Sequence, residues 1–292
     1  MELVAEVTDE PQEEVQRRLR KEHQRLGSNV WEEMQRWGIE PYVWSDKLVE
    51  FYSKTDAFLY ESLVWNRTAK KNQMRKWIGE FLARDFAGPA KILTYGDGLG
   101  FDSLYLTKAG HDVTSFEVSE KCVKLAKSVF ARAGETLRIL GSPEEVEEEA
   151  YDVVVCLDVL EHVPDPPGLV GQLAGALRRG GRLIVHAPFF YVAWNVVTHL
   201  RANKKYSGDL VRLYTPHGLT PIDGQFFWDP LVLEKCDRNA GPRNRFAGRE
   251  VLLRWSGLLL SVGRFWPLPH IWVAKLLSKV EKEYKHELWI EE

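Results

Sequence analysis

The sequence contains few cysteines. Only three occur among its 292 residues: Cys122, Cys156 and Cys236. Three scattered thiols are too few for a disulfide framework or a cysteine-based zinc site. Cys122 and Cys156 lie in apolar patterns and are expected to be core residues. We therefore expect no metal centre.

Long apolar runs and a basic-then-apolar leader are also missing. A spanning helix needs about 20 predominantly apolar residues. The nearest stretch, residues 255–273, contains Arg264, Pro267 and Pro269. The chain opens Met1-Glu-Leu-Val-Ala-Glu, unlike a secretory signal. We expect a cytoplasmic protein with no membrane span.

Charge of one sign is not in excess. The formal net charge is -3, which gives no basic field for nucleic acid. An Asn/Asp-Pro-Pro-Tyr motif is absent, so nucleic acid is not an expected partner. The hydrophobic content of 45% is ordinary for a globular protein, and the length allows one large domain with additions or two small ones.

Aromatic residues are abundant in the N-terminal quarter. Residues 11–26, 30–37 and 44–86 have helical patterns, which predict a helical extension over 1–88. These helices either pack on the sheet edge or form a lid over a site. If they form a lid, we expect its walls to include Trp44, Tyr60, Trp65 and Asn66.

From residue 90 the pattern alternates between strands and helices, which favours a doubly wound α/β fold with a mostly parallel, seven-stranded sheet. Residues 153–157 are apolar on both faces, as in a central strand. The remaining predicted strands are 91–95, 113–118, 136–140, 183–186, and an antiparallel pair over 219–223 and 227–233. An aromatic helix is expected from 189 to about 201. We divide the chain into an extension, 1–88, a cofactor-binding domain, 89–237, and a helical tail, 238–292.

Three glycines follow the first of these strands. Gly96, Gly98 and Gly100 occupy alternate positions, and Glu117 ends the next strand 21 positions after Gly96. Glycines let the backbone turn sharply near a ligand, and a carboxylate there accepts hydrogen bonds from ribose hydroxyls. A dinucleotide fingerprint would need glycine where Phe101 stands. Asp97 in the loop would repel a pyrophosphate but suits a cationic sulfonium cofactor.

A second signature follows the central strand, in Leu160-Glu-His-Val-Pro-Asp-Pro166. Together with the glycine loop, Glu117 and Gly180-Gly-Arg-Leu-Ile-Val185, it resembles the class I S-adenosylmethionine-dependent methyltransferases. The Glu-His-Val-Pro motif resembles that of the small-molecule branch of the superfamily. The resemblance covers about residues 75–236. It implies a Rossmann-like fold, S-adenosyl-L-methionine as cofactor and S-adenosyl-L-homocysteine as product.

The resemblance also implies roles for cofactor-binding residues. The backbone of the three glycines would lie under the methionine and ribose parts of the cofactor. Glu117 would bind the ribose hydroxyls, and Val118 would pack on the adenine. Asp97 would reach the ammonium group. Ser142, or a backbone carbonyl, would replace the acid that commonly meets the adenine amino group. The full expected set is Tyr95, Gly96, Asp97, Gly98, Gly100, Glu117, Val118, Ser142, Leu157 and Asp158.

Methyl transfer needs little beyond alignment, since the sulfonium is already activated. A general base would add rate where the acceptor loses a proton. His162, His186 and Tyr60 are the first candidates, and His199, His217 and Tyr191 follow. For His162 a structural role in its turn is the alternative, and for His186 it is a role as a polar core residue.

The leading interpretation is methylation of an O, N, S or C atom of a small, aromatic or apolar metabolite. Methylation of a peptide or protein side chain is an alternative that an open groove would favour. A catalytically silent cofactor-binding protein is another. A nicotinamide dehydrogenase competes but is disfavoured by Phe101. The oligomeric state is open, with a dimer as one possibility.

Overall fold

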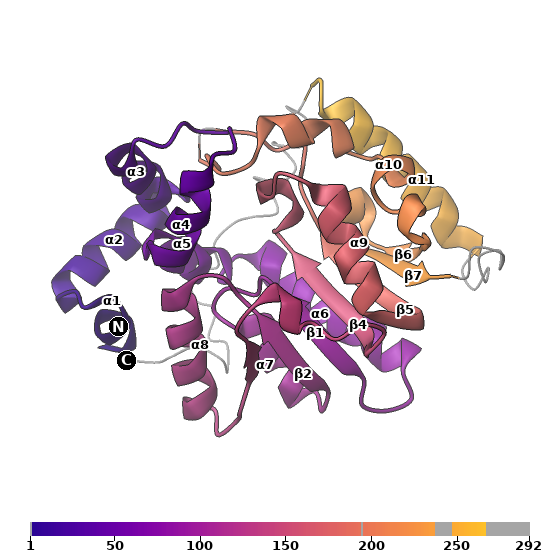
Figure 1. Ribbon diagram of the computed structural model, residues 1–292, viewed down its shortest axis with the longest axis horizontal. Helices are drawn as coiled ribbons and strands as arrows, with labels where there is room; N and C mark the ends of the chain where they lie inside the picture. Colours follow the sequence, from indigo (N-terminus) through magenta and orange to yellow (C-terminus); the bar gives the residue numbers. More distant parts are fainter. Residues whose placement is uncertain (1, 194, 237–246, 267–292) are drawn as a thin grey trace.

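A seven-stranded sheet forms the centre of the computed structural model, which describes residues 2–193, 195–236 and 247–266 (Figure 1). The strand order is β3-β2-β1-β4-β5-β7-β6, and β7 runs antiparallel to both of its neighbours. The remaining pairs are parallel, so the predicted fold class is confirmed. The strands are β1 (Lys91–Tyr95), β2 (Asp112–Phe116), β3 (Arg138–Leu140), β4 (Tyr151–Leu157), β5 (Leu177–His186), β6 (Leu219–Gly224) and β7 (Leu231–Lys235).

The central strand β4 is apolar on both faces because helices cover both faces of the sheet. Val153, Val155 and Leu157 pack in one cluster with α6 (Ala69–Asp85) and α7 (Phe101–Lys108). Val154 and Cys156 pack in another with α9 (Pro166–Ala176). This alternation follows from the two-residue period of a strand.

The strand order reverses between β1 and β4, which places a topological switch point there. Ligands of open α/β sheets bind beyond the carboxyl ends of the strands at such a point. The glycine loop follows β1 and Asp158 follows β4, so both reach this edge. The order of strands therefore brings the two sequence signatures together.

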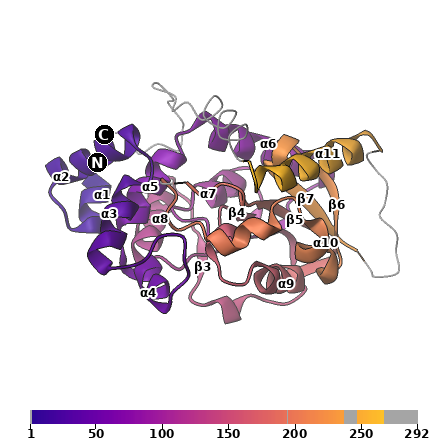
Figure 2. The ribbon, with the colours of Figure 1, turned by 90° about the horizontal axis from the view of Figure 1, so that it is seen from above.

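The N-terminal helices gather with α8 (Glu120–Arg132) at one side of the molecule, and α11 (Ala247–Gly263) lies at the opposite side beside β6 and β7 (Figures 1 and 2). Buried apolar residues of α1, α2 and α5 share a cluster with α7 and α8. A second aromatic-rich cluster joins α3 and α4 to Val197 and Leu200. The helices are α1 (Glu2–Thr8), α2 (Gln12–Gln24), α3 (Ser28–Trp37), α4 (Asp46–Lys54) and α5 (Ala57–Trp65).

The helix predicted over 189–201 is wrong. The described residues between β5 and Leu200 form turns, and short helices follow at Arg201–Tyr206 and in α10 (Leu210–Leu213). Tertiary partners take the place of helical hydrogen bonds: Tyr42 donates its amide to the carbonyl of Val197, and Leu200 donates to that of Glu161. Backbone polar groups need partners, but not helical ones.

The carboxyl-terminal region agrees with the sequence in part. The antiparallel pair is confirmed, although its second strand begins at Leu231 because Phe226–Trp228 forms a short helical turn. One of the two predicted tail helices is α11, and the other lies outside the described residues. Within the described ranges, the helices lack the length and apolarity that crossing a bilayer requires.

Candidate functional site

The glycine loop and Glu117 are joined by hydrogen bonds. The Gly98 amide donates to Glu117 Oε2 at 2.7 Å, and the Ser119 amide donates to Oε1 at 2.8 Å. Burial raises the pKa of Glu117, while these amides act in the opposite direction. Gly96 has a φ of 74°, and a Cβ on it would lie 2.5 Å from a Val159 methyl group. Only glycine therefore fits the first position.

A cavity of about 760 Å³ opens beside this loop. Its cofactor-side lining includes Gly96, Gly98 and Glu117, together with Val118, a residue that is 52% exposed. A backbone bend free of side chains, an acid and an exposed apolar face fit a nucleoside cofactor at a switch point. The residues present therefore fit S-adenosylmethionine.

The far end of the cavity is aromatic. It is bounded by α2, α4 and α5 and by the segment that follows β5. Its aromatic lining residues there are Trp44, Tyr52, Phe58, Trp65, Phe190 and Tyr191.

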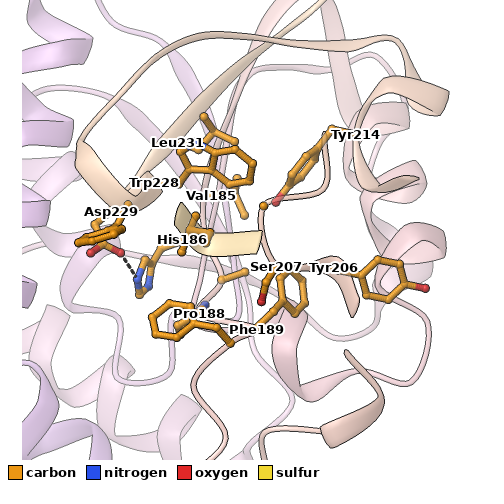
Figure 3. A pocket seen from close by; sticks show the side chains of 15 residues that line it. Val185, His186, Pro188, Phe189, Tyr206, Ser207, Tyr214, Trp228, Asp229 and Leu231 are labelled. Atoms are coloured by element: carbon orange, nitrogen blue, oxygen red, sulfur yellow. Dashed lines mark ion pairs between the residues drawn. The ribbon is translucent and has the colours of Figure 1, made fainter. Parts of the chain in front are cut away.

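A chain of buried and partly buried charged groups crosses the carboxyl ends of β4 and β5, and we call it the His186 network: Lys70, Asp229, His186, Asp158 and Lys71. His186 Nδ1 lies 2.6 Å from Asp158 Oδ1. On the other side of the ring, His186 Nε2 lies 2.6 Å from Asp229 Oδ1, the pair shown in Figure 3. Lys70 pairs with Asp229 at 3.1 Å and Lys71 with Asp158 at 3.6 Å.

The protonation of His186 follows from this arrangement. Burial acts to lower the pKa of His186, but Asp158 and Asp229 outweigh it and raise the pKa to about 9. Burial opposes ionisation of Asp158, yet His186 and Lys71 hold its pKa well below the ordinary value. His186 is therefore a cation at neutral pH, which argues against its predicted role as a general base.

A second group of side chains lies at the aromatic end. Glu161 Oε1 is 3.9 Å from His162 Nε2 and 3.8 Å from His199 Nε2. Burial raises the pKa of Glu161 to about 8 and lowers that of His162 to about 4. Among the described residues, these three form the group of side chains that could together hold a metal ion.

Most of the predicted site residues meet at the cavity. Of the cofactor set, Tyr95, Gly96, Gly98, Glu117, Val118 and Asp158 line it, and so do His162, His186, His199 and Tyr191. Asp97, Leu157 and Asn66 line an adjoining cavity of about 100 Å³ that shares Trp65 and Asp158 with the first.

Tyr60 does not line either cavity and is corrected here as a candidate base. Its side chain is fully buried, its hydroxyl donates to Glu10, and the Arg18 guanidinium lies 4.0 Å from its ring. The tyrosine anchors the N-terminal segment to α5. His217 also lies away from the cavities, with its ring against Gly171 of α9.

Three cofactor expectations differ from the structure. Asp97 accepts from the amides of Asp102 and Ser103 at 3.2 and 2.7 Å, so its carboxylate binds the first turn of α7 instead of pointing freely at a ligand. Gly100 faces the core, where a Cβ would lie 3.0 Å from that of Ala126. Ser142 lines neither cavity.

Sequence reasoning missed several polar residues of the site. Glu161 belongs to the Glu-His-Val-Pro motif, so the motif itself was the available signal. Lys71 and Asp102 pair at 2.9 Å beneath the loop, and Trp65 Nε1 donates to Asp158 at 3.0 Å. No local pattern marks these two contacts, because the first joins α6 to α7 and the second joins α5 to the residue that follows β4.

The chain is similar to known methyltransferases. Residues 65–220, more than half of the chain, match the family model described as a methyltransferase domain. A ubiquinone biosynthesis O-methyltransferase of Bordetella avium is 36% identical over 110 residues, which is 36% of this chain and 45% of that protein. The enzyme of the same name from Hydrogenovibrio crunogenus is 34% identical over 154 residues, covering 51% and 61%. The chain thus spans about half the length of these relatives.

Two solved structures are also similar. Magnesium protoporphyrin IX methyltransferase from Synechocystis gives a TM-score of 0.43 at 22% identity, covering 56% of this chain and 78% of that one. The 1,6-didemethyltoxoflavin-N1-methyltransferase of Burkholderia thailandensis gives 0.41 at 22%, covering 56% and 79%. On the family match, the chain belongs to the methyltransferase domain family, and its α/β unit is a class I S-adenosylmethionine-dependent methyltransferase domain.

Proposed function

We propose that this protein methylates a small acceptor enclosed beneath its N-terminal helices. The continuity of the large cavity carries the proposal. It begins at Gly96, Gly98 and Glu117 and ends among aromatic side chains such as Trp44 and Phe58. The first end suits the cofactor, which leaves the second for the acceptor.

The end of the cavity beside the glycine loop would bind S-adenosylmethionine. S-adenosylmethionine supplies an activated methyl group when bound. Gly98 and Glu117 would hold the ribose, Val118 would cover the adenine, and Leu157 and Asp158 would border the methyl-bearing region. The protein's part is to orient the two reactants and exclude water, which can contribute roughly 7–11 kcal/mol through proximity.

The acceptor end favours a flat, apolar or aromatic molecule. Tyr52 and Phe58 stack with ring centroids 4.7 Å apart, and Trp44 lines the same end. The relatives named above are O-methyltransferases, so a hydroxyl-bearing ring is our first choice of acceptor. The Glu161, His162 and His199 group would receive the polar part of that ring.

A peptide substrate would need an open groove over Asp158. Here α4 and α5 and the segment around Tyr191 bound the cavity on that side. The aromatic side chains that line this side favour the small-molecule, Glu-His-Val-Pro branch over the protein-methylating alternative. We further propose a division into a covering region, 1–88, a cofactor domain, 89–237, and a tail, 238–292.

The proposal is tested with radiolabelled S-adenosylmethionine. The full chain is incubated with a panel of phenols, catechols and aryl amines and, in parallel, with a mixed peptide library. We expect label in small molecules and none in peptides, and we expect S-adenosylhomocysteine to bind by calorimetry. Label found only in peptides would show that the acceptor is a peptide and not a small molecule. Failure of S-adenosylhomocysteine to bind the folded chain would refute the proposal as a whole.

A further inference from the structure

The Glu161 side chain is buried without a hydrogen-bond partner. Its residue is 1% exposed, and neither carboxylate oxygen has a hydrogen-bond donor among the described residues. An unpaired carboxylate away from water is costly and must either take up a proton or find a cation. The structure therefore leaves a place for a positive charge beside Glu161.

Two imidazole rings lie beside the Glu161 carboxylate. His162 Nε2 and His199 Nε2 lie 3.9 and 3.8 Å from Glu161 Oε1, and the ligand atoms of the three residues all lie within 4.8 Å of one another. A neutral imidazole offers a nitrogen lone pair, which a cation can use.

The rings are oriented by their other nitrogens. His199 Nδ1 lies 2.6 Å from the carbonyl oxygen of Tyr191, so it donates there and leaves Nε2 as the acceptor. His162 Nδ1 lies 3.2 Å from the Tyr52 hydroxyl. Metal-binding histidines are commonly held through the second nitrogen by a carbonyl or similar group, which fixes the tautomer.

The two chain segments are also tied together. Leu200 donates its amide to the Glu161 carbonyl at 3.0 Å, and Asn203 Nδ2 donates to the carbonyls of Glu161 and Val163 at 3.2 and 2.8 Å. These bonds hold His199 beside the Glu-His-Val-Pro turn, although the two lie far apart in sequence. The three side chains are therefore positioned before any ligand arrives.

We propose that Glu161, His162 and His199 bind one divalent first-row transition ion, with zinc as the preferred ion. Two imidazoles and one carboxylate with an open position are a known zinc-binding set, whereas magnesium and calcium prefer oxygen ligands. Tetrahedral zinc places its ligand atoms about 3.4 Å apart. The two Glu161–histidine separations, 3.9 and 3.8 Å, would shorten by about half an ångström to reach that value, and the remaining pair, which lies within 4.8 Å, would close by at most about 1.4 Å.

The open position of this ion faces the substrate. All three ligands line the large cavity at its aromatic end, so an oxygen or nitrogen of the acceptor could complete the coordination. Coordination of the acceptor by the ion rests on the proposed function, whereas binding of the ion itself does not. The site revises our expectation that the protein has no metal centre.

Zinc binding is measured on the full chain after chelator treatment, by calorimetric titration with zinc chloride at neutral pH. We expect one ion per chain. Glu161→Gln and His199→Gln should each weaken binding at least about 100-fold, which is more than loss of an outer-shell partner typically costs. The visible absorption of bound Co²⁺ should report nitrogen and oxygen ligands and disappear in both variants.

Two control variants separate this site from adventitious binding. His111→Gln changes a histidine at the amino-terminal end of β2, and Cys236→Ser removes a thiol that is not deeply buried. Both should bind zinc as the wild type does. S-adenosylhomocysteine binding and circular dichroism establish that each variant is folded. If either Glu161→Gln or His199→Gln does not fold, zinc binding by the one that folds tests the proposal.

Two results would overturn the proposal. One is a folded chain that binds S-adenosylhomocysteine but no zinc. The other is zinc binding that persists in Glu161→Gln and His199→Gln or is lost in Cys236→Ser. A failure of methyl transfer with zinc binding intact would count against the proposed function alone.

Discussion

His186 and Asp158 join the ends of two adjacent strands, with His186 Nδ1 2.6 Å from Asp158 Oδ1. Asp158 also has a positive φ of 60° and receives the Trp65 indole at 3.0 Å. The carboxylate is therefore fixed from the sheet and from α5 at once. Because it borders both cavities, this pair sets the geometry at the centre of the candidate site.

Replacing His186 with Asn leaves Asp158 and Asp229 without the cation between them and should destabilise the fold by about 3 kcal/mol near neutral pH. The folded-state pKa is near 9 and above the ordinary value, so this stabilisation is complete below about pH 6.5 and is lost as pH rises through 9.

The measurement is the difference in unfolding free energy between wild type and His186→Asn, by urea denaturation at several pH values. His111→Asn is the control, because burial lowers its pKa and it lies outside the His186 network. A difference that stays constant from pH 6.5 to beyond pH 9 would show that His186 is neutral in the folded protein.

Glu117→Ala should weaken S-adenosylhomocysteine binding by about 1.5–3 kcal/mol, or about 10- to 150-fold in Kd. The change removes the acceptor expected for the ribose and also releases the Gly98 amide. Calorimetry gives the affinity. Glu120→Ala, on the exposed start of α8, should bind as wild type, and equal affinity in the two variants would reject the cofactor-site assignment.

Gly98→Val should abolish cofactor binding while the fold survives. The position has a φ of 60°, and apart from the Ser62 hydroxyl at 3.6 Å a Cβ would meet open cavity. Gly110→Val is the matched control, since Gly110 has a φ of 88° with nothing near its Cβ and lies outside both cavities.

Both valine variants should lose about 1–3 kcal/mol from backbone strain in thermal or urea unfolding. Only Gly98→Val should lose binding of S-adenosylhomocysteine. If the two variants bind alike, the loop is not the floor of the cofactor site.

Trp65→Phe should destabilise the fold by about 1–3 kcal/mol, because it leaves an oxygen of the Asp158 carboxylate without its indole donor. Trp77→Phe provides the comparison: Trp77 stacks on Phe81 along α6, away from both cavities. Urea denaturation of both variants is the test. A smaller loss for Trp65→Phe than for Trp77→Phe would contradict the importance of this contact.

The local sequence determined the α/β fold and the cofactor end of the site. The two-residue period of the strands, the alternate glycines and the acid that follows β2 are local patterns, so most strand positions and the placement of the glycine loop and Glu117 at the cofactor end could be anticipated. The apolar character of both faces of residues 153–157 also predicted the central place of β4, since only a strand covered on both sides reads that way.

Tertiary structure decided the rest. The segment after β5 looked helical, but its backbone bonds to Tyr42 and Glu161 instead, and this places His199 beside Glu161. Tyr60 looked like a wall of the site, but Glu10 and Arg18 hold it elsewhere. The charge on His186 depends on Asp158 and Asp229, which come from other parts of the chain. Protonation and ligand grouping depend on distances across the fold, which residues far apart in sequence acquire only when the sheet and its covering helices assemble.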